Sequence, residues 1–175
     1  MTAPAPPSAH ACAVKVGSHG VLIRGPSGAG KSRLAFDLIL AGRSGQLPPA
    51  VLVADDRVRL DTDGKELWAR AIPGLAGLIE IFGLGIRRCD YVDAAPIGLV
   101  VDLAAPDAER LPPPEAQQIS LFGVLLPRIP VAAGHNAFPL VVAALTTTAS
   151  SSSVNHSDHC EKGIGNHISP TFATE

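Results

Sequence analysis

The sequence is poor in cysteine, with only three among 175 residues, at Cys12, Cys89 and Cys160. Their number is odd and their spacing is irregular, so they provide neither a disulfide framework nor the ligand spacing of a zinc site. Cysteine usage of this kind suits the reducing conditions of the cytoplasm. We therefore expect a cytoplasmic protein.

Charge and long apolar runs are limited as well. Charged residues make up 17% of the chain and the net charge is −2, which argues against a protein that holds nucleic acid through general electrostatics. No apolar run approaches the roughly 20 residues that cross a bilayer. Residues 1–9 lack the basic and apolar regions of a signal peptide. We expect neither nucleic acid nor membrane as a partner.

The most informative segment is GVLIRGPSGAGKS, residues 20–32. Within it, GPSGAGKS fits the pattern G-x-x-x-x-G-K-[ST], whose glycines let successive N–H groups converge on one anion. We expect Lys31 to reach the β- and γ-phosphates of ATP, and the Ser32 hydroxyl to help hold magnesium. The predicted ATP-binding residues are those of the whole loop: Gly25, Pro26, Ser27, Gly28, Ala29, Gly30, Lys31 and Ser32.

Periodicity around this loop predicts an α/β domain with a mixed sheet and β-hairpins. Residues 11–24 and 57–71 each predict a hairpin, the second around an Asp-Gly turn. The apolar runs 50–54 and 97–104 predict buried strands, and we expect the first of them to be central in the sheet. A helix is predicted after the loop, with Gly42 at its C-cap.

Two later segments leave alternatives open. Residues 120–132, SLFGVLLPRIPVA, predict one or two strands broken by Pro127 and Pro130. Residues 138–149 fit either a short helix or a last strand, because periodicity alone does not separate the two. Beyond Leu145 the composition becomes polar and of low complexity, which predicts disorder.

Phosphoryl transfer also needs a metal-binding carboxylate and a base for the attacking hydroxyl. Asp55 and Asp56 follow the strand at 50–54, at the strand end where ligands bind in open α/β sheets. Adjacent strand residues point to opposite faces, so we expect only one of the pair to face the phosphates. Glu80 is the only charged residue in 72–86, and needs a partner or a metal if it is buried. A solvated strand end and an exposed loop glutamate remain the simpler alternatives.

Together these motifs resemble the C-terminal catalytic domain of the HPr kinase/phosphorylase family. The resemblance runs from His10 to about Leu145. It is carried by His10, by GPSGAGKS, by LVADDRV, and by LIEIFGLGI, which is similar to the family signature L-E-I-R-G-L-G-I. That family phosphorylates a serine of HPr, the phosphocarrier of the sugar phosphotransferase system, using ATP, and removes the phosphate by phosphorolysis. The resemblance implies a P-loop kinase fold similar to that of phosphoenolpyruvate carboxykinase, assembled as a hexamer.

The resemblance also implies the site. Catalytic residues of the family align with His10, Lys31, Asp56 and Arg110. Asp56 matches the acid/base that takes the serine proton in one direction and returns it in the other. Ser32 and Glu80 match the magnesium ligands. Without the resemblance, we would interpret His10 as a structural histidine and Arg110 as a surface charge. ATP and Mg²⁺ are the implied cofactors, and an HPr-like carrier is the implied partner.

Several positions depart from the family pattern. Phe82 and His135 stand where the pattern has arginines, and Arg33 stands where it commonly has glutamate. The two lost arginines would hold phosphate, so we expect a protein that is mainly a kinase. Two other hypotheses stay open, an ATP-sensing regulatory module with little catalysis and a small-molecule kinase.

The expected organisation is a short form of the family with the catalytic domain only, as in alphaproteobacteria. We expect residues 1–9 to be a flexible N-terminus and residues 10–146 to form the catalytic domain. Residues 147–175 are predicted to be a low-complexity, disordered tail.

Overall fold

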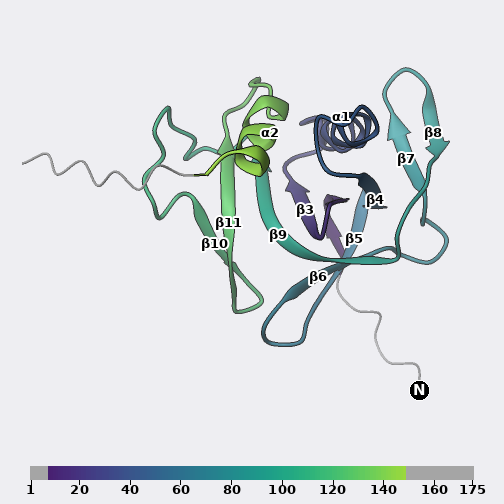
Figure 1. Cartoon of the computed structure of the whole chain (residues 1–175), viewed down its shortest axis with the longest axis horizontal. Coiled ribbons are helices and arrows are strands. Elements are labelled where there is room, and N and C mark those ends of the chain that lie inside the picture. Colours follow the sequence, from purple (N-terminus) through teal and green to yellow (C-terminus); the bar gives the residue numbers. More distant parts are fainter. Residues whose placement is uncertain (1–7, 149–175) are drawn as a thin grey trace, which may run out of the picture.

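The protein consists of a curled mixed sheet with helices on one side (Figure 1). The structure is a computed structural model, and it describes residues 8–148. The elements in chain order are β1 (Ser8–His10), β2 (Cys12–Val16), β3 (His19–Arg24), α1 (Lys31–Arg43), β4 (Ala50–Ala54), β5 (Arg57–Thr62), β6 (Leu67–Arg70), β7 (Leu78–Ile81), β8 (Gly85–Arg88), β9 (Ala94–Leu103), β10 (Gln118–Leu121), β11 (Val124–Val131) and α2 (Phe138–Thr146).

The long strand β9 organises the sheet. The strand order is β1-β5-β6-β9-β3-β2-β4, and β11, paired with β10, also joins β9. The first residues of β9 pair antiparallel with β6, whereas its later residues run parallel to β3 and β11. The carboxyl ends of β3, β9 and β11 therefore meet at one edge, which is where open α/β sheets bind ligands.

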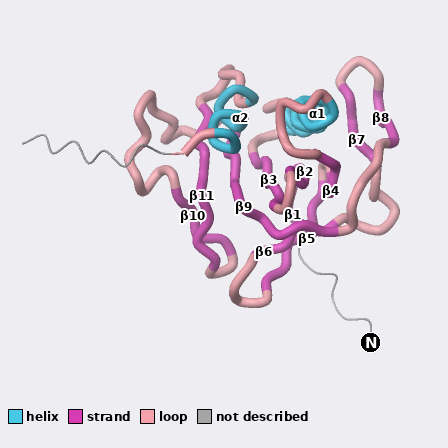
Figure 2. Tube along the Cα trace, viewed as in Figure 1, coloured by secondary structure: helices cyan, strands magenta, loops and turns pink. Residues whose placement is uncertain are grey.

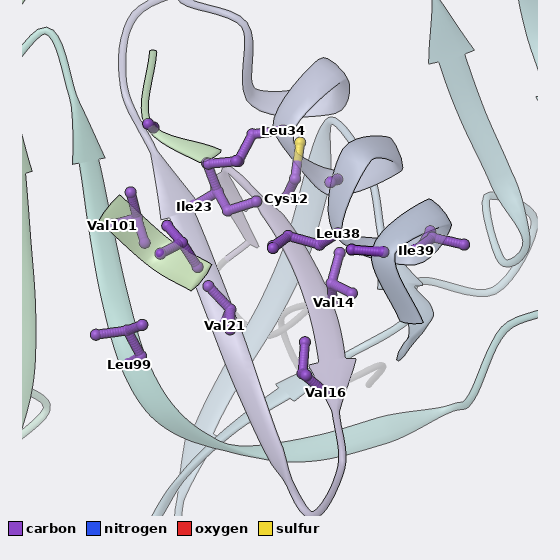
Figure 3. Packing of buried hydrophobic residues seen from close by; sticks show 14 of the residues in the cluster. Cys12, Val14, Val16, Val21, Ile23, Leu34, Leu38, Ile39, Leu99 and Val101 are labelled. Carbon is purple, nitrogen blue, oxygen red and sulfur yellow. The ribbon is translucent and has the colours of Figure 1, made fainter. Parts of the chain in front are cut away.

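The core lies on both faces of this sheet. On one face, β2 and β3 pack against α1 through buried residues such as Val14, Ile23 and Leu38 (Figure 3). Alternation along β3 turns Leu22 to the opposite face, where it joins a second cluster with β5, β6 and β9. Figure 2 shows both helices on the same side of the sheet. This two-sided burial fixes the strands whose ends carry the polar residues described below.

Most local predictions are confirmed. The hairpins at 11–24 and 57–71 are β2–β3 and β5–β6, the latter closed by a turn in which Gly64 has φ +88°. The run 97–104 lies largely within β9, and the segment at 138–149 forms the helix α2 rather than a strand. No helix in the described range 8–148 is long and apolar enough to span a membrane.

The predicted C-cap at Gly42 is wrong. Helix α1 continues through Arg43 and is capped at Ser44. Gly42 is needed for packing instead, because a Cβ at this position would lie 2.5 Å from the backbone nitrogen of Ala50. The glycine thus lets α1 approach β4 rather than ending the helix.

The predicted central position of β4 is also wrong, since β4 ends the strand order. Its run is apolar because Leu52 and Val53 are buried in the clusters on the two opposite faces. The carbonyl of Leu52 accepts a hydrogen bond from the Val92 backbone N–H at 2.9 Å, so a crossing segment covers the free edge. Burial on both faces therefore does not distinguish a central strand from a covered edge strand.

The break predicted at the prolines of residues 120–132 falls elsewhere. The chain turns at Phe122 and Gly123, both with positive φ, and Pro127 and Pro130 lie inside β11. The first half of β11 pairs with β10 and the second half with β9, so each half has one free side where a missing N–H costs nothing.

The ends of the domain differ partly from expectation. Strand β1 begins at Ser8 and pairs antiparallel with β5, so residues 8 and 9, which we expected to be flexible, are part of the sheet. The remainder of the flexible N-terminus and the tail predicted from residue 149 onward lie outside the described residues.

Candidate active site

The glycine-rich loop joins β3 to α1 at the carboxyl edge of the sheet. Gly25 has φ +147°, and a Cβ there would lie 2.9 Å from the Leu103 carbonyl of β9, so this position requires glycine. Gly30 takes a left-handed conformation at the N-cap of α1 and provides no side-chain cap. The first N–H groups of α1 thus have no side-chain partner and are available to an anion, as at other helix N-termini that bind phosphate.

Lys31 lies across this loop with its side chain almost buried, at 6% exposure. Its ammonium donates to the carbonyls of Gly25 and Pro26, each at 2.9 Å, and lies 3.0 Å from Nε2 of His10. The ammonium has three protons and no acceptor, so Nε2 must accept. All three protons are therefore used, and the lysine is held beside the N–H groups at the start of α1.

His10 connects Lys31 to Asp56. Because Nε2 accepts from Lys31, Nδ1 carries the ring proton, and it lies 3.1 Å from both the Oδ1 and the backbone carbonyl of Asp56. Asp56 has φ +62°, uncommon for a residue with a side chain, and its carboxylate is 64% exposed. The structure thus brings three of the four predicted catalytic residues together, with an accessible carboxylate at the end of the chain of contacts.

Asp55 points into the protein and contacts the other side of the loop. Its Oδ1 accepts hydrogen bonds from the Ser32 hydroxyl at 2.8 Å and from the Cys12 thiol, and its Oδ2 accepts from the Glu80 backbone N–H at 2.9 Å. We expected only one aspartate to face the phosphates; Asp55 contacts the loop directly through Ser32, whereas Asp56 is connected to it only through His10 and Lys31. Alternation stops at Asp56 because that residue leaves the extended conformation.

The thiol of Cys12 is a hydrogen-bond donor here. Burial, followed by the charge of Asp55 and its hydrogen bond, raises the pKa of Cys12 to about 12. The group therefore stays protonated at neutral pH. No sequence signal distinguished Cys12 from an ordinary buried cysteine.

Glu80 is exposed on β7, and its backbone N–H, rather than its carboxylate, contacts Asp55. Ser32 and Asp55 place oxygen atoms on one side of the loop, next to the backbone of Glu80, and Mg²⁺ prefers oxygen donors. Within residues 8–148 no three His, Cys, Asp or Glu side chains form a metal-binding group. The residues fit a magnesium ion that takes several ligands from phosphates and water rather than from the protein.

A cavity of about 230 Å³ lies beside the loop. Its walls are residues 26–29, Leu103 and Ala104 at the end of β9, and residues 131–135 at the end of β11. His135 thus shares a cavity with the glycine-rich loop. A larger pocket of about 410 Å³, lined by Pro114, Gln117 and residues of the β10–β11 hairpin, contains none of the predicted site residues.

Arg110 is not brought to this cluster. It is exposed in the loop after β9, and makes no side-chain hydrogen bond or ion pair within the described residues. The loop that carries it is anchored by Arg128, which donates to Asp107 at 2.6 Å and to the Ala116 carbonyl at 3.0 Å. Its predicted catalytic role therefore depends on rearrangement or on substrate.

An ion cluster beneath the loop was missed from sequence. Asp102 of β9 accepts two hydrogen bonds from Arg24, both at 2.7 Å, and one from Arg128 at 2.6 Å. Burial would raise the pKa of Asp102, but the hydrogen bonds and charges of the two arginines outweigh it and hold the pKa below its usual value. The available signal was an aspartate inside the apolar run IGLVVDLA, since a buried charge must be paired.

Comparisons with known proteins identify the family that this chain resembles. Residues 4–162 match a family model described as the HPr Serine kinase C-terminal domain. The chain is 38% identical over 156 residues to an HPr kinase/phosphorylase of Azoarcus sp., covering 81% of this chain and 47% of that protein. It is 35% identical over 176 residues to the HPr kinase/phosphorylase of Lacticaseibacillus casei, covering 92% and 52%. The chain thus spans about half the length of the curated relatives it matches.

The fold of this chain also matches that of a solved structure. The structure of the HPr(Ser) kinase/phosphatase from Coxiella burnetii matches with a TM-score of 0.63 and 25% identity, covering 78% of this chain and 87% of that one. The predicted α/β P-loop kinase fold with a mixed sheet is therefore confirmed.

Proposed function

The chain belongs to the HPr kinase/phosphorylase family through the C-terminal domain of that family, and we propose that it transfers phosphate from ATP to a serine of an HPr-like carrier. The observation that carries the proposal is the contact chain from Lys31 through His10 to Asp56. A phosphate-binding lysine and an accessible carboxylate lie at its two ends. A module that only senses ATP needs the first of these groups but not the second.

In the proposed reaction Asp56 is the base. Its exposed carboxylate takes the proton of the acceptor serine as the serine oxygen attacks the γ-phosphorus, and the bond from that phosphorus to the β–γ bridging oxygen breaks to release ADP. His10 fixes the position of Asp56 through a hydrogen bond to its backbone carbonyl, and the same Nδ1 lies 3.1 Å from Oδ1 of the carboxylate. In the reverse direction the protonated Asp56 would return its proton to the serine oxygen.

Lys31 and the loop N–H groups would hold the phosphates. A lysine ammonium placed at the transferring phosphate stabilises charge that develops in the transition state. Its present bonds to the Gly25 and Pro26 carbonyls keep it at this position, and a phosphate oxygen would replace one of them. Arg110 is proposed as a further cation that approaches when substrate binds.

Ser32 and Glu80 are proposed to hold Mg²⁺, with Asp55 behind Ser32. When bound, magnesium would neutralise charge on the β- and γ-phosphates. The Ser32 hydroxyl donates its proton to Asp55, so its oxygen lone pairs are free to face a cation. The all-oxygen donor set supports this assignment.

The direction of the reaction is proposed to favour the kinase. Phe82 is fully exposed at the β7–β8 turn, and His135 lines the cavity beside the loop. Both replace arginines of the family pattern, and phosphorolysis must hold a free phosphate near a phosphoserine of like charge. We also propose a cytoplasmic homohexamer with its catalytic domain at residues 10–146, on family resemblance.

The proposal is tested by incubating the protein with Mg²⁺, labelled ATP and purified HPr, followed by mass spectrometry of the carrier. One phosphate on a serine is expected, and none with a Lys31→Ala control. A panel of small acceptors in place of HPr separates a protein kinase from a small-molecule kinase. Binding of MgATP without phosphate on any acceptor would favour the regulatory module.

A further inference from the structure

The carboxylate of Asp55 is held entirely by neutral donors. It is 6% exposed, and within residues 8–148 no lysine, arginine or histidine forms an ion pair with it. Its three partners are the thiol of Cys12, the hydroxyl of Ser32 and the backbone N–H of Glu80. A buried charge without a cation depends on such donors, so each one has a large effect on where the carboxylate points.

Two of these donors share one oxygen. Oδ1 accepts from both Cys12 and Ser32, and the sulfur lies 3.8 Å from the Ser32 hydroxyl oxygen. Oδ2 is left to the Glu80 backbone. Rotation of the carboxylate about its Cβ–Cγ bond would break contacts on both sides at once, so the thiol helps to define which oxygen faces Ser32.

Cys12 itself is rigidly placed. It is completely buried on β2, paired with Ile23 of β3, and lies in the cluster between the sheet and α1 (Figure 3). Its thiol stands where an aliphatic side chain would fill the core equally well but could not donate. The thiol therefore differs from the rest of this cluster in reaching a polar group of the site.

We propose that Cys12 is a positioning residue for the metal–nucleotide complex, acting through the Asp55 carboxylate on the Ser32 hydroxyl. The thiol fixes the position of Oδ1 of Asp55 by a hydrogen bond. Oδ1 in turn accepts a hydrogen bond from the Ser32 hydroxyl, so that the lone pairs of the Ser32 oxygen are directed toward the cation position. Without the thiol, Oδ1 of Asp55 loses one of its two hydrogen-bond donors, and the orientation of the Ser32 hydroxyl is no longer fixed. The inference rests on the proposed binding of nucleotide and magnesium at this loop.

Matched variants separate donation from packing. Cys12→Val keeps an apolar side chain of similar size and removes the donor, whereas Cys12→Ser keeps a donor. Val14→Ala is the packing control, because Val14 is buried in the same cluster two residues along β2 and its side chain has no hydrogen-bonding group. Binding of Mn²⁺ with ADP, measured by electron paramagnetic resonance and calorimetry, reports the site without requiring phosphate transfer.

Cys12→Val should weaken binding of the Mn²⁺–ADP pair about tenfold, as expected for losing one hydrogen bond to a charged group. Cys12→Ser should stay within about twofold of wild type, and Val14→Ala should lower the melting temperature with unchanged affinity. Unchanged affinity in Cys12→Val, or equal loss in Cys12→Ser, overturns the proposal. Wild type that binds Mn²⁺–ADP but does not phosphorylate HPr overturns the proposed function alone, whereas absent binding overturns both.

A second measurement covers the case in which Cys12→Val does not fold. In a Cys89→Ser, Cys160→Ser background, Cys12 is the single thiol, and its S–H stretching band should lie at lower frequency than that of an unbonded thiol. Asp55→Asn should move this band to higher frequency, because the amide oxygen is a weaker acceptor. A band that Asp55→Asn leaves in place shows that the thiol does not donate to Asp55, and overturns the proposal.

Discussion

Replacing Asp102 by alanine should destabilise the fold strongly, because this carboxylate holds two arginines together beneath the glycine-rich loop. Asp102 is 9% exposed, and Arg128, which shares it with Arg24, has a side chain that is 11% exposed. Removing one partner of a buried ion pair leaves uncompensated charge and typically costs 3–5 kcal/mol. Since Arg24 is partly solvated and Arg128 retains Asp107, we expect about 3 kcal/mol for Asp102→Ala.

The matched control is Asp61→Ala. Asp61 forms an ion pair with Arg70 at 2.8 Å, but the two side chains are 42% and 36% exposed. Exposed pairs contribute about 0–1 kcal/mol. Urea unfolding followed by circular dichroism should therefore show a large loss of unfolding free energy for Asp102→Ala and a small one for Asp61→Ala.

The pH dependence gives an independent check. The pKa of Asp102 is lower in the folded than in the unfolded protein, so the carboxylate stabilises the fold above the unfolded value of 3.8. That contribution is lost as the pH falls through the lower folded pKa. The difference in stability between wild type and Asp102→Asn should be constant near neutral pH and shrink below about pH 4. The reasoning would be refuted if Asp102→Ala and Asp61→Ala lost equal unfolding free energy. It would also be refuted if the stability difference between wild type and Asp102→Asn did not change with pH.

Three further predictions concern the site. Lys31→Ala should abolish ATP binding in calorimetry and cost roughly 2–4 kcal/mol of transition-state stabilisation, while its circular dichroism spectrum stays that of wild type. A Lys31→Ala variant with wild-type affinity and turnover would contradict the P-loop assignment. Asp55→Asn should weaken metal–nucleotide binding rather than only slow transfer, and a normal Kd with slow turnover would contradict this. Phe82→Arg with His135→Arg should raise phosphate-dependent release of pyrophosphate from phosphorylated HPr, and a wild type that already dephosphorylates as fast as it phosphorylates would show that the missing arginines do not set the direction.

Local chemistry could be predicted from the sequence. The loop from Gly25 to Ser32, the Asp-Gly hairpin and the strand that leads into Asp55 each depend on residues that are neighbours in the chain. Family resemblance then selected His10 and Asp56, which lie 46 positions apart and are in contact. Contacts of this second kind follow from strand pairing, which the spacing of apolar residues does not encode.

What could not be predicted depended on tertiary context. Asp56 adopts a left-handed conformation that only the folded chain specifies, so the strand alternation applied to LVADDR does not extend to this residue. Strand β4 looks central because α1 and a crossing segment bury an edge strand. The pairing of Asp102 with Arg24 and Arg128 unites three strands, and no local pattern identifies the partners of a buried charge.

The central claim is that Asp56, oriented by His10, takes the proton of the acceptor serine while the nucleotide is held independently of it. The direct test is single-turnover transfer from labelled MgATP to HPr by rapid quench, for wild type and Asp56→Asn, with MgATP affinity measured in parallel. The account predicts equal affinity and a transfer rate reduced by about 10²–10⁴-fold in the variant. Transfer by Asp56→Asn at the wild-type rate would contradict it and place the acid/base role on another residue.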